Sequence, residues 1–209
     1  ICINDDTVTV TSPDISSCQY GIYVQNGSDV TVTGGSISHS SSFGIWAGAS
    51  AVTVSSTDID GSVVGGSSEP ETSNGFLYGV WVDSSATVTV TDCCSIHDNE
   101  YGIYVASNAP NALVANGNSI FNNSLYGIYW ASVYTGLNCE ENWWGDVEGP
   151  ILDGASVAPR DGIAPVPGID YSPWLDGPCP NGDPVGMNAK LKGVARSGQP
   201  GLEVNFTDL

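Results

Sequence analysis

Two aspartates and one histidine are the residues of this sequence with the clearest capacity for acid–base chemistry. Asp58 and Asp60 flank Ile59, and in a strand that buries Ile59 both carboxylates would point outward on one face. Alignment of the internal repeats places Ser38, Asp60 and His97 on one outward ladder. A carboxylate beside an imidazole can exchange protons, and two carboxyls flanking a glycosidic bond can hydrolyse it. The competing interpretation is that these are solvated surface residues with a simple His–Asp contact.

Five aromatic residues define a second candidate surface, because each occupies an outward position of a repeated strand. They are Tyr23, Trp46, Trp81, Tyr104 and Tyr129. We expect their rings to stack in one exposed column, which would stabilise the sheet. A contiguous exposed apolar stripe can also bind glycans or pack against a neighbouring protein.

These aromatic residues belong to five near-copies of one five-residue phrase. It consists of an aromatic residue, then Gly, then Ile or Val, then a second aromatic residue and finally an apolar residue. The copies are centred on Gly21, Gly44, Gly79, Gly102 and Gly127. Successive glycines are 23, 35, 23 and 25 residues apart, a period typical of solenoids. The long interval contains a Gly- and Ser-rich insertion at 61–77, which is predicted to be a surface loop.

A second phrase, Val-x-Val followed by a lone isoleucine, repeats out of phase with the first, as in Val30-Thr-Val32 and Ile37. Each coil therefore contains three short segments in which apolar and polar residues alternate, the pattern of half-buried strands. The sequence predicts an all-β parallel β-helix with three sheets. It would have about six coils of roughly 23 residues, with equivalent residues about 4.8 Å apart along the axis.

The repeat decays after residue 130, where Asn142-Trp-Trp-Gly-Asp146 and later Asp170-Tyr-Ser-Pro-Trp-Leu175 appear. We expect a C-terminal cap at 146–176 that covers the open end of the core, since the last coil would otherwise expose a sheet edge. A sugar-stacking platform is the alternative for such a Trp-rich segment. The predicted organisation is a β-helix with its cap at 1–176, a linker at 177–188 and a β-strand tail at 189–209.

The Tyr-Gly-Ile-Tyr-Val and Val-Thr-Val phrases, closed by Asn-Trp-Trp-Gly-Asp and Asp-Tyr-Ser-Pro-Trp-Leu, resemble secreted β-helix repeat proteins of the pectate-lyase-like superfamily. This resemblance covers residues 5–176 and implies the right hand of the helix and secretion. It does not imply a reaction, because the superfamily contains enzymes and non-catalytic proteins. The stretch Gly201-Leu-Glu-Val-Asn-Phe-Thr-Asp-Leu209 resembles the opening of a polycystic-kidney-disease-type immunoglobulin-like domain.

The resemblance implies two enzymatic alternatives. Lyases of this superfamily use an Arg or Lys base, but the first basic residue here is Arg160, so a lyase is disfavoured. Its hydrolases use aspartates, for which Asp58, Asp60 and His97 are the candidates. We expect instead a non-catalytic module that acts as a rigid spacer or self-assembling, filament-forming unit. A carbohydrate-binding module that uses the aromatic column is a further alternative.

The six cysteines indicate an oxidising compartment, and a Cys139–Cys179 bridge is predicted to tie the last coil to the segment that follows it. Asn26, Asn122 and Asn205 begin N-glycosylation triplets. No cofactor or metal site is predicted outright, because no pair of cysteines has zinc-ligand spacing. Ca²⁺ could be held by carboxylates at 5–6 or at 146 and 148.

Charge limits the partners of this chain. The net charge is −19 and only four residues are Lys or Arg, so the surface should repel nucleic acid and anionic lipid. No apolar run approaches the roughly 20 residues of a membrane span, so direct membrane insertion is not expected. The sequence predicts a secreted or cell-surface protein whose partners are copies of itself, other cell-surface proteins or glycans.

Overall fold

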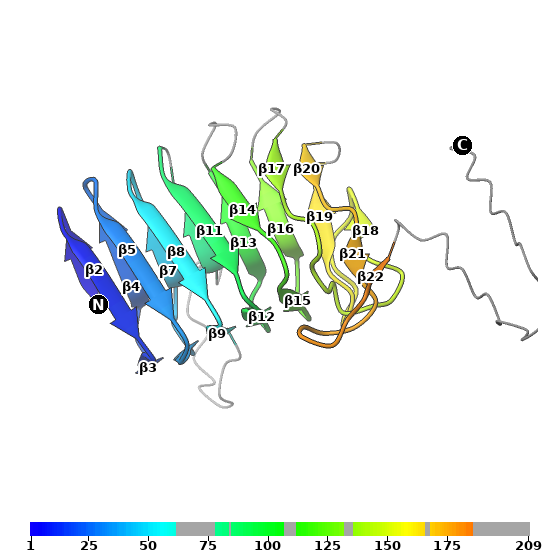
Figure 1. Cartoon of the computed structure of the whole chain (residues 1–209), viewed down its shortest axis with the longest axis horizontal. Helices are drawn as coiled ribbons and strands as arrows, with labels where there is room; N and C mark the ends of the chain where they lie inside the picture. Colours follow the sequence, from blue (N-terminus) through cyan, green and yellow to red (C-terminus); the bar gives the residue numbers. More distant parts are fainter. Residues whose placement is uncertain (62–77, 84, 107–111, 132–135, 166–167, 186–209) are drawn as a thin grey trace, which may run out of the picture.

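The computed structural model describes residues 1–61, 78–83, 85–106, 112–131, 136–165 and 168–185. Within these ranges the chain winds into a parallel β-helix with three parallel sheets and no α-helix (Figure 1). The predicted all-β, three-sheet solenoid is thus confirmed. The insertion at 62–77 and the tail at 186–209 lie outside the described residues, and so does the resemblance to an immunoglobulin-like domain.

The strands of each sheet follow one another along the helix axis. The first sheet contains, in order, β1 (Cys2–Asn4), β4 (Tyr20–Gln25), β7 (Phe43–Ala47), β10 (Tyr78–Val82), β13 (Tyr101–Val105), β16 (Tyr126–Trp130), β19 (Gly162–Ala164) and β18 (Ile151–Leu152). The second contains β2 (Thr7–Thr11), β5 (Asp29–Thr33), β8 (Ala51–Ser55), β11 (Thr87–Thr91), β14 (Leu113–Ala115), β17 (Leu137–Asn138) and β20 (Ile169–Asp170). The third contains β3 (Asp14–Ser16), β6 (Ser36–Ser38), β9 (Asp58–Asp60), β12 (Ser95–His97) and β15 (Ser119–Phe121).

The core consists of stacks of equivalent aliphatic side chains. In the first sheet one such stack runs through six neighbouring strands: Ile22, Ile45, Val80, Ile103, Ile128 and Ile163, all fully buried. Each such residue contributes about 1.5–3 kcal/mol by leaving water. A coil on its own could not bury these side chains, so stacking of the repeats is what stabilises the fold.

The repeated glycine allows the coils to approach closely at one corner. A Cβ atom at Gly44, Gly79 or Gly102 would lie 2.6 Å from the carbonyl oxygen of the glycine in the next coil. The glycine and the following Ile or Val are both buried. The aromatic residues before and after this pair therefore both lie on the outer surface.

Asparagines at the turns form hydrogen-bonded ladders inside the helix. The Oδ1 atom of Asn123 accepts hydrogen bonds from the backbone N and the Nδ2 atom of Asn99, both at 3.1 Å. Asn142 does the same for Asn118, at 3.0 and 3.1 Å. Since these amides are buried, the ladders satisfy groups that would otherwise cost about 1–3 kcal/mol each.

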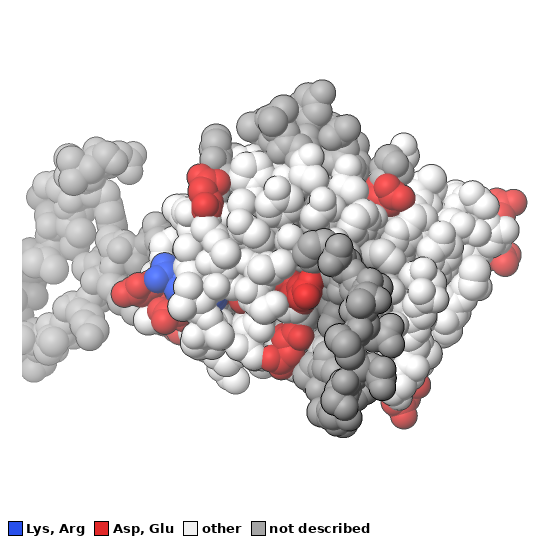
Figure 2. All heavy atoms as spheres, turned by 180° about the vertical axis from the view of Figure 1, so that it is seen from behind, with Lys and Arg blue, Asp and Glu red and all other residues white. Residues whose placement is uncertain are grey.

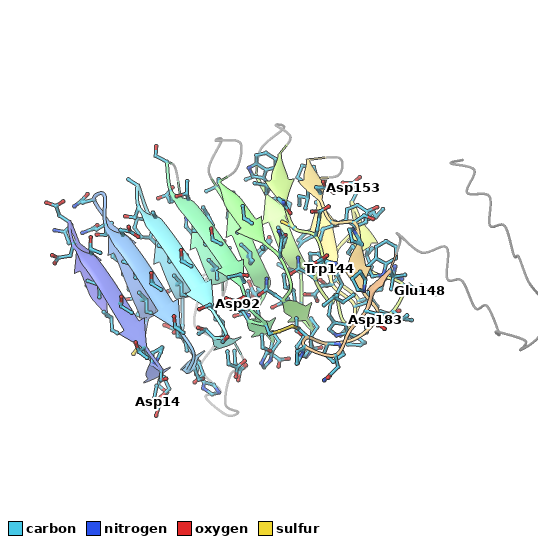
Figure 3. All side chains as sticks on the ribbon, in the orientation of Figure 1. Asp14, Asp92, Trp144, Glu148, Asp153 and Asp183 are labelled. Atoms are coloured by element: carbon cyan, nitrogen blue, oxygen red, sulfur yellow. A yellow bond between two sulfur atoms is a disulfide. The ribbon has the colours of Figure 1, made fainter. Side chains whose placement is uncertain are left out.

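The segment predicted as a cap continues two of the sheets. Strands β19 and β20 pair with β16 and β17 in parallel, and β18 then adds to the edge of the first sheet. Trp144 is fully buried in the interior near this end (Figure 3). The segment between the two Trp-containing phrases thus supplies further strands as well as a cover. Its sequence did not indicate this, because each strand contributes only one or two apolar residues.

The described part of the predicted linker, residues 177–185, packs against the β-helix. Strand β21 (Trp174–Leu175) pairs with β22 (Pro184–Val185) in an antiparallel hairpin. The Cys179 backbone N donates to the Ser119 Oγ atom at 3.0 Å, in the third sheet. Residues 177–185 are thus held by a hairpin and by a hydrogen bond to the third sheet.

Candidate functional site

His97 lies among three carboxylates on the outer face of the third sheet. The register pairs His97 with Asp60 and Asp60 with Ser38, which confirms the predicted ladder. The shorter contact with the neighbouring strand β9, however, is diagonal, since His97 Nε2 lies 3.0 Å from Asp58 Oδ1. The other ring nitrogen, Nδ1, lies 2.8 Å from Asp98 Oδ2 and 3.9 Å from Asp60 Oδ1.

Two residues that sequence analysis did not select complete this cluster. Asp98 follows His97 at the end of β12, with a positive φ of 57° that turns the chain, and its carboxylate accepts a hydrogen bond from the Asn122 side chain. Phe121, the next residue on the ladder, stacks on the imidazole with ring centroids 5.0 Å apart. The only sequence signal for Asp98 was its position beside the histidine.

The surroundings of His97 stabilise its charged form. Burial lowers the pKa of His97, but hydrogen bonds to Asp98 and Asp58 and the charge of Asp60 outweigh burial, so its pKa is raised. Because each ring nitrogen faces a carboxylate, the site favours the imidazolium form of His97 over the neutral form. Asp60, His97 and Asp98 also offer ligand atoms within 4.8 Å of one another, and they form the only candidate metal group in the described ranges.

We predict that His97→Gln removes a pH-dependent part of the stability. Because the folded-state pKa is raised, the ion pairs stabilise fully below the ordinary pKa of about 6.5, and this stability is lost as the pH rises through the folded-state value. Urea unfolding should show the variant about 1–2 kcal/mol less stable at pH 6, with a smaller difference at pH 9. His39→Asn is the control, since asparagine tolerates its positive φ of 53°. An equal difference at both pH values would contradict this prediction.

The five predicted aromatic residues do form a column on the first sheet. Tyr23 pairs with Trp46, Trp46 with Trp81, Trp81 with Tyr104, and Tyr104 with Tyr129. Tyr23 and Trp46 stack with ring centroids 4.3 Å apart, Trp81 and Tyr104 at 4.4 Å, and Tyr104 and Tyr129 at 5.5 Å. The rings thus lie one on another along the helix axis.

A second aromatic column, which sequence analysis did not predict, runs beside the first. It contains the first residue of each phrase: Tyr20, Phe43, Tyr78, Tyr101 and Tyr126. Neighbouring rings stack at 5.2–5.9 Å, and the columns meet edge to face, as in the Tyr78–Trp81 pair at 84°. We call the ten rings the aromatic face. Because each ring covers its neighbours, the aromatic face presents mainly ring edges to solvent.

Mutual shielding changes the chemistry of the phenols. Burial, together with the neighbouring tyrosines and Glu100, raises the pKa of Tyr78 to about 12. Burial is also the largest cause of the raised pKa values of Tyr101 and Tyr104. These hydroxyl groups therefore stay protonated over the physiological range and can donate hydrogen bonds.

The fold agrees with a family comparison. A family model described as the right-handed beta helix region matches residues 1–143, more than half of the chain. The chain belongs to the right-handed β-helix family. No curated protein and no solved structure gives a significant match. The pectate-lyase-like type of this β-helix therefore stays a prediction.

The disulfide of the β-helix differs from the predicted one. Cys179 is bonded to Cys93, with Cα atoms 5.4 Å apart, and the predicted Cys139–Cys179 bridge is wrong. Cys139 is fully buried in the hydrophobic core, where burial raises its pKa, so its thiol cannot reach the surface segment. The chain after β21 instead crosses the third sheet toward Cys93.

The other predicted sites of the β-helix lie at separate places. Asn26 is exposed, Asn122 is partly buried and bonded to Asp98, and Asn205 lies outside the described residues. The carboxylate of Glu148 pairs with Arg160 at 2.8 Å, and neither pair proposed for Ca²⁺ belongs to the candidate metal group. In the described ranges, no helix has the length and apolar character that crossing a bilayer requires.

Proposed function

We propose that this right-handed β-helix is a non-catalytic, extracellular structural module, a rigid spacer whose aromatic face packs against a second copy or another cell-surface protein. The observation that carries the proposal is the aromatic face itself. It extends over five consecutive coils and offers ring edges and protonated hydroxyl groups. Contiguous apolar surface of this kind usually marks an interaction site, and Tyr and Trp are the residues that interfaces favour.

Charge and the disulfide support the same proposal. Most of the molecular face seen in Figure 2 is uncharged, and acidic side chains lie there in isolated groups. An interface on such a surface would bury few unpaired charges.

The Cys93–Cys179 disulfide is typical of proteins in an oxidising compartment, which supports an extracellular location.

The proposal is tested by measuring the mass of the chain in solution over a wide concentration range, with electron microscopy of the same samples. We expect oligomers or filaments, which Tyr129→Lys should dissociate because it places a charge in the aromatic face. Thr89→Lys, on the outer face of the second sheet, is the matched control. Self-assembly would be contradicted, and only the spacer role left, if the wild-type chain stays monomeric up to about 1 mM. The free energy of association would then be weaker than roughly −4 kcal/mol.

A glycoside hydrolase is the second candidate, favoured by the convergence of Asp58, Asp60 and Asp98 on His97. Against it, an imidazole hydrogen-bonded to carboxylates at both nitrogens is a poor general base. A polysaccharide-degradation screen tests this alternative. Activity that Asp60→Asn abolishes would support it and contradict the non-catalytic proposal.

A further inference from the structure

A pocket in the C-terminal cap is lined by apolar residues, two aromatic rings and one ion pair. Its volume is about 270 Å³, and it lies between the chain at 148–152 and the rings of Tyr171 and Trp174. This cap also contains three of the five exposed large hydrophobic residues of the described chain, Val147, Leu152 and Val157. Of these three, Leu152 lines the pocket, together with Pro150 and Ile151, so the pocket combines apolar walls with a concave shape.

The indole of Trp174 is held firmly in place. One side of the ring packs against Gly149, where an added Cβ would lie 2.6 Å from the ring. The Nε1 atom donates to the Val147 carbonyl oxygen at 3.1 Å. Tyr171 lies beside it, with ring centroids 6.2 Å apart and planes at 26°. Both rings line the cap pocket together with the Glu148 and Arg160 side chains.

The polar side of the pocket is an ion pair fixed to the backbone. The Arg160 guanidinium donates from Nε to the Gly149 carbonyl oxygen at 2.6 Å and from Nη1 to Glu148 Oε2 at 2.8 Å. The Glu148 side chain remains 73% exposed, so its carboxylate can accept further hydrogen bonds from solvent or a ligand. Figure 3 shows Glu148 at this end of the molecule.

This arrangement fixes the charge of a suitable ligand. Arg160 is neutralised by Glu148, and the chain as a whole carries −19, so an anionic ligand would be repelled. A ligand with one apolar face and several hydroxyl groups would use both sides of the pocket. Its C–H groups would lie against the aromatic rings, and its hydroxyl groups would bond the carboxylate and guanidinium.

We propose that the cap pocket binds a neutral pyranose residue of a glycan. Such a residue could belong to a free neutral polysaccharide or to a glycan attached to a glycoprotein, and the recognised chemistry is the same. This site is separate from the aromatic face, so it does not depend on the packing role proposed above.

The test is a titration of the purified chain with neutral oligosaccharides, followed by calorimetry and ligand-observed NMR. One arm uses unbranched glucan, mannan and galactan oligomers, and the other uses released oligomannose N-glycans, so the two sources are distinguished. We expect dissociation constants on the order of 0.1–1 mM for at least one arm. Tyr171→Ala should weaken binding about tenfold, which corresponds to the loss of one aromatic contact.

Glu148→Gln provides a second variant that cannot be confused with misfolding, because this side chain is exposed. It should weaken binding roughly threefold to tenfold, the usual effect of one hydrogen bond. Thr89→Ala, on the outer face of the second sheet, is the matched control and should leave binding unchanged. Tyr129→Ala tests whether sugar binds the aromatic face instead. Absence of binding to wild type at 10 mM sugar, or loss of binding only with Tyr129→Ala, would overturn the proposal.

Discussion

Asp161→Asn is expected to make the protein more stable at pH 8 and to remove most of the pH dependence of its stability between pH 4 and pH 7. Asp161 is fully buried and ends one of the asparagine ladders, where it accepts hydrogen bonds from the N and Nδ2 atoms of Asn123 at 2.9 and 2.6 Å. Burial, opposed in part by these bonds, raises the pKa of Asp161 from 3.8 to about 7.

The sign of the effect follows from the proton that the folded state retains. Between about pH 4 and pH 7 the folded carboxyl is protonated while the unfolded one is ionised, so stability increases as the pH falls through this range. The full shift corresponds to about 4 kcal/mol. Asparagine at position 161 would be neutral at every pH. Its Oδ1 atom could accept both bonds from Asn123, as Asn123 Oδ1 does from Asn99 one coil earlier.

The measurement is urea unfolding of both chains at half-unit steps from pH 4 to pH 8. The exposed carboxylate Asp183 provides the control variant Asp183→Asn (Figure 3). The stabilisation by the His97 ion pairs changes with pH only above about pH 6.5, so His97→Gln should lower the stability without changing its pH dependence below pH 6.5. If the variant and wild type lose equal stability from pH 4 to pH 7, Asp161 is not the group responsible.

Removal of the Cys93–Cys179 disulfide should lower the free energy of unfolding by up to about 4 kcal/mol. The bond closes a loop with a sequence separation of 86, and the chain-entropy model assigns about this value to loops of this length. The double variant Cys93→Ser with Cys179→Ser should therefore unfold at a lower denaturant concentration and expose 177–185 to proteases first.

Cys18→Ser is the matched control, because Cys18 is exposed and its thiol is free. Without reductant, the denaturation midpoint of the control should match that of wild type. With reductant, which cleaves the disulfide in both proteins, the two midpoints should again match. An unchanged denaturation midpoint in the double variant would mean that β21, β22 and the Ser119 contact alone hold the segment.

The sequence was sufficient for the fold and for the first aromatic column, because both depend on a local pattern repeated in every coil. Ile22 and Tyr23 alternate inward and outward, and their equivalents do the same. The second column was missed because Gly21 and Ile22 are both buried, which breaks the alternation and turns Tyr20 outward.

Contacts between different coils were harder to predict than positions within one coil. The ladder of Asp60 and His97 follows from register alone, but the shorter bond from His97 to Asp58 depends on side-chain rotamers. The disulfide depends on the path of 177–185 after the repeat has ended. Neither the path of that segment nor the burial of Asp161 leaves a periodic signal.

The register of the first sheet has a consequence for the length of the protein. Adjacent coils meet through matching positions, such as Ile22 with Ile45 and Tyr23 with Trp46. The two sides of a coil that meet its neighbours along the helix axis are therefore complementary to each other. A duplicated segment 20–42 would stack on its own copy without a change in the core. Modules of this kind can lengthen by whole coils, each adding about 4.8 Å. The reach of a spacer could thus be changed by gene duplication alone, with its cap left unchanged.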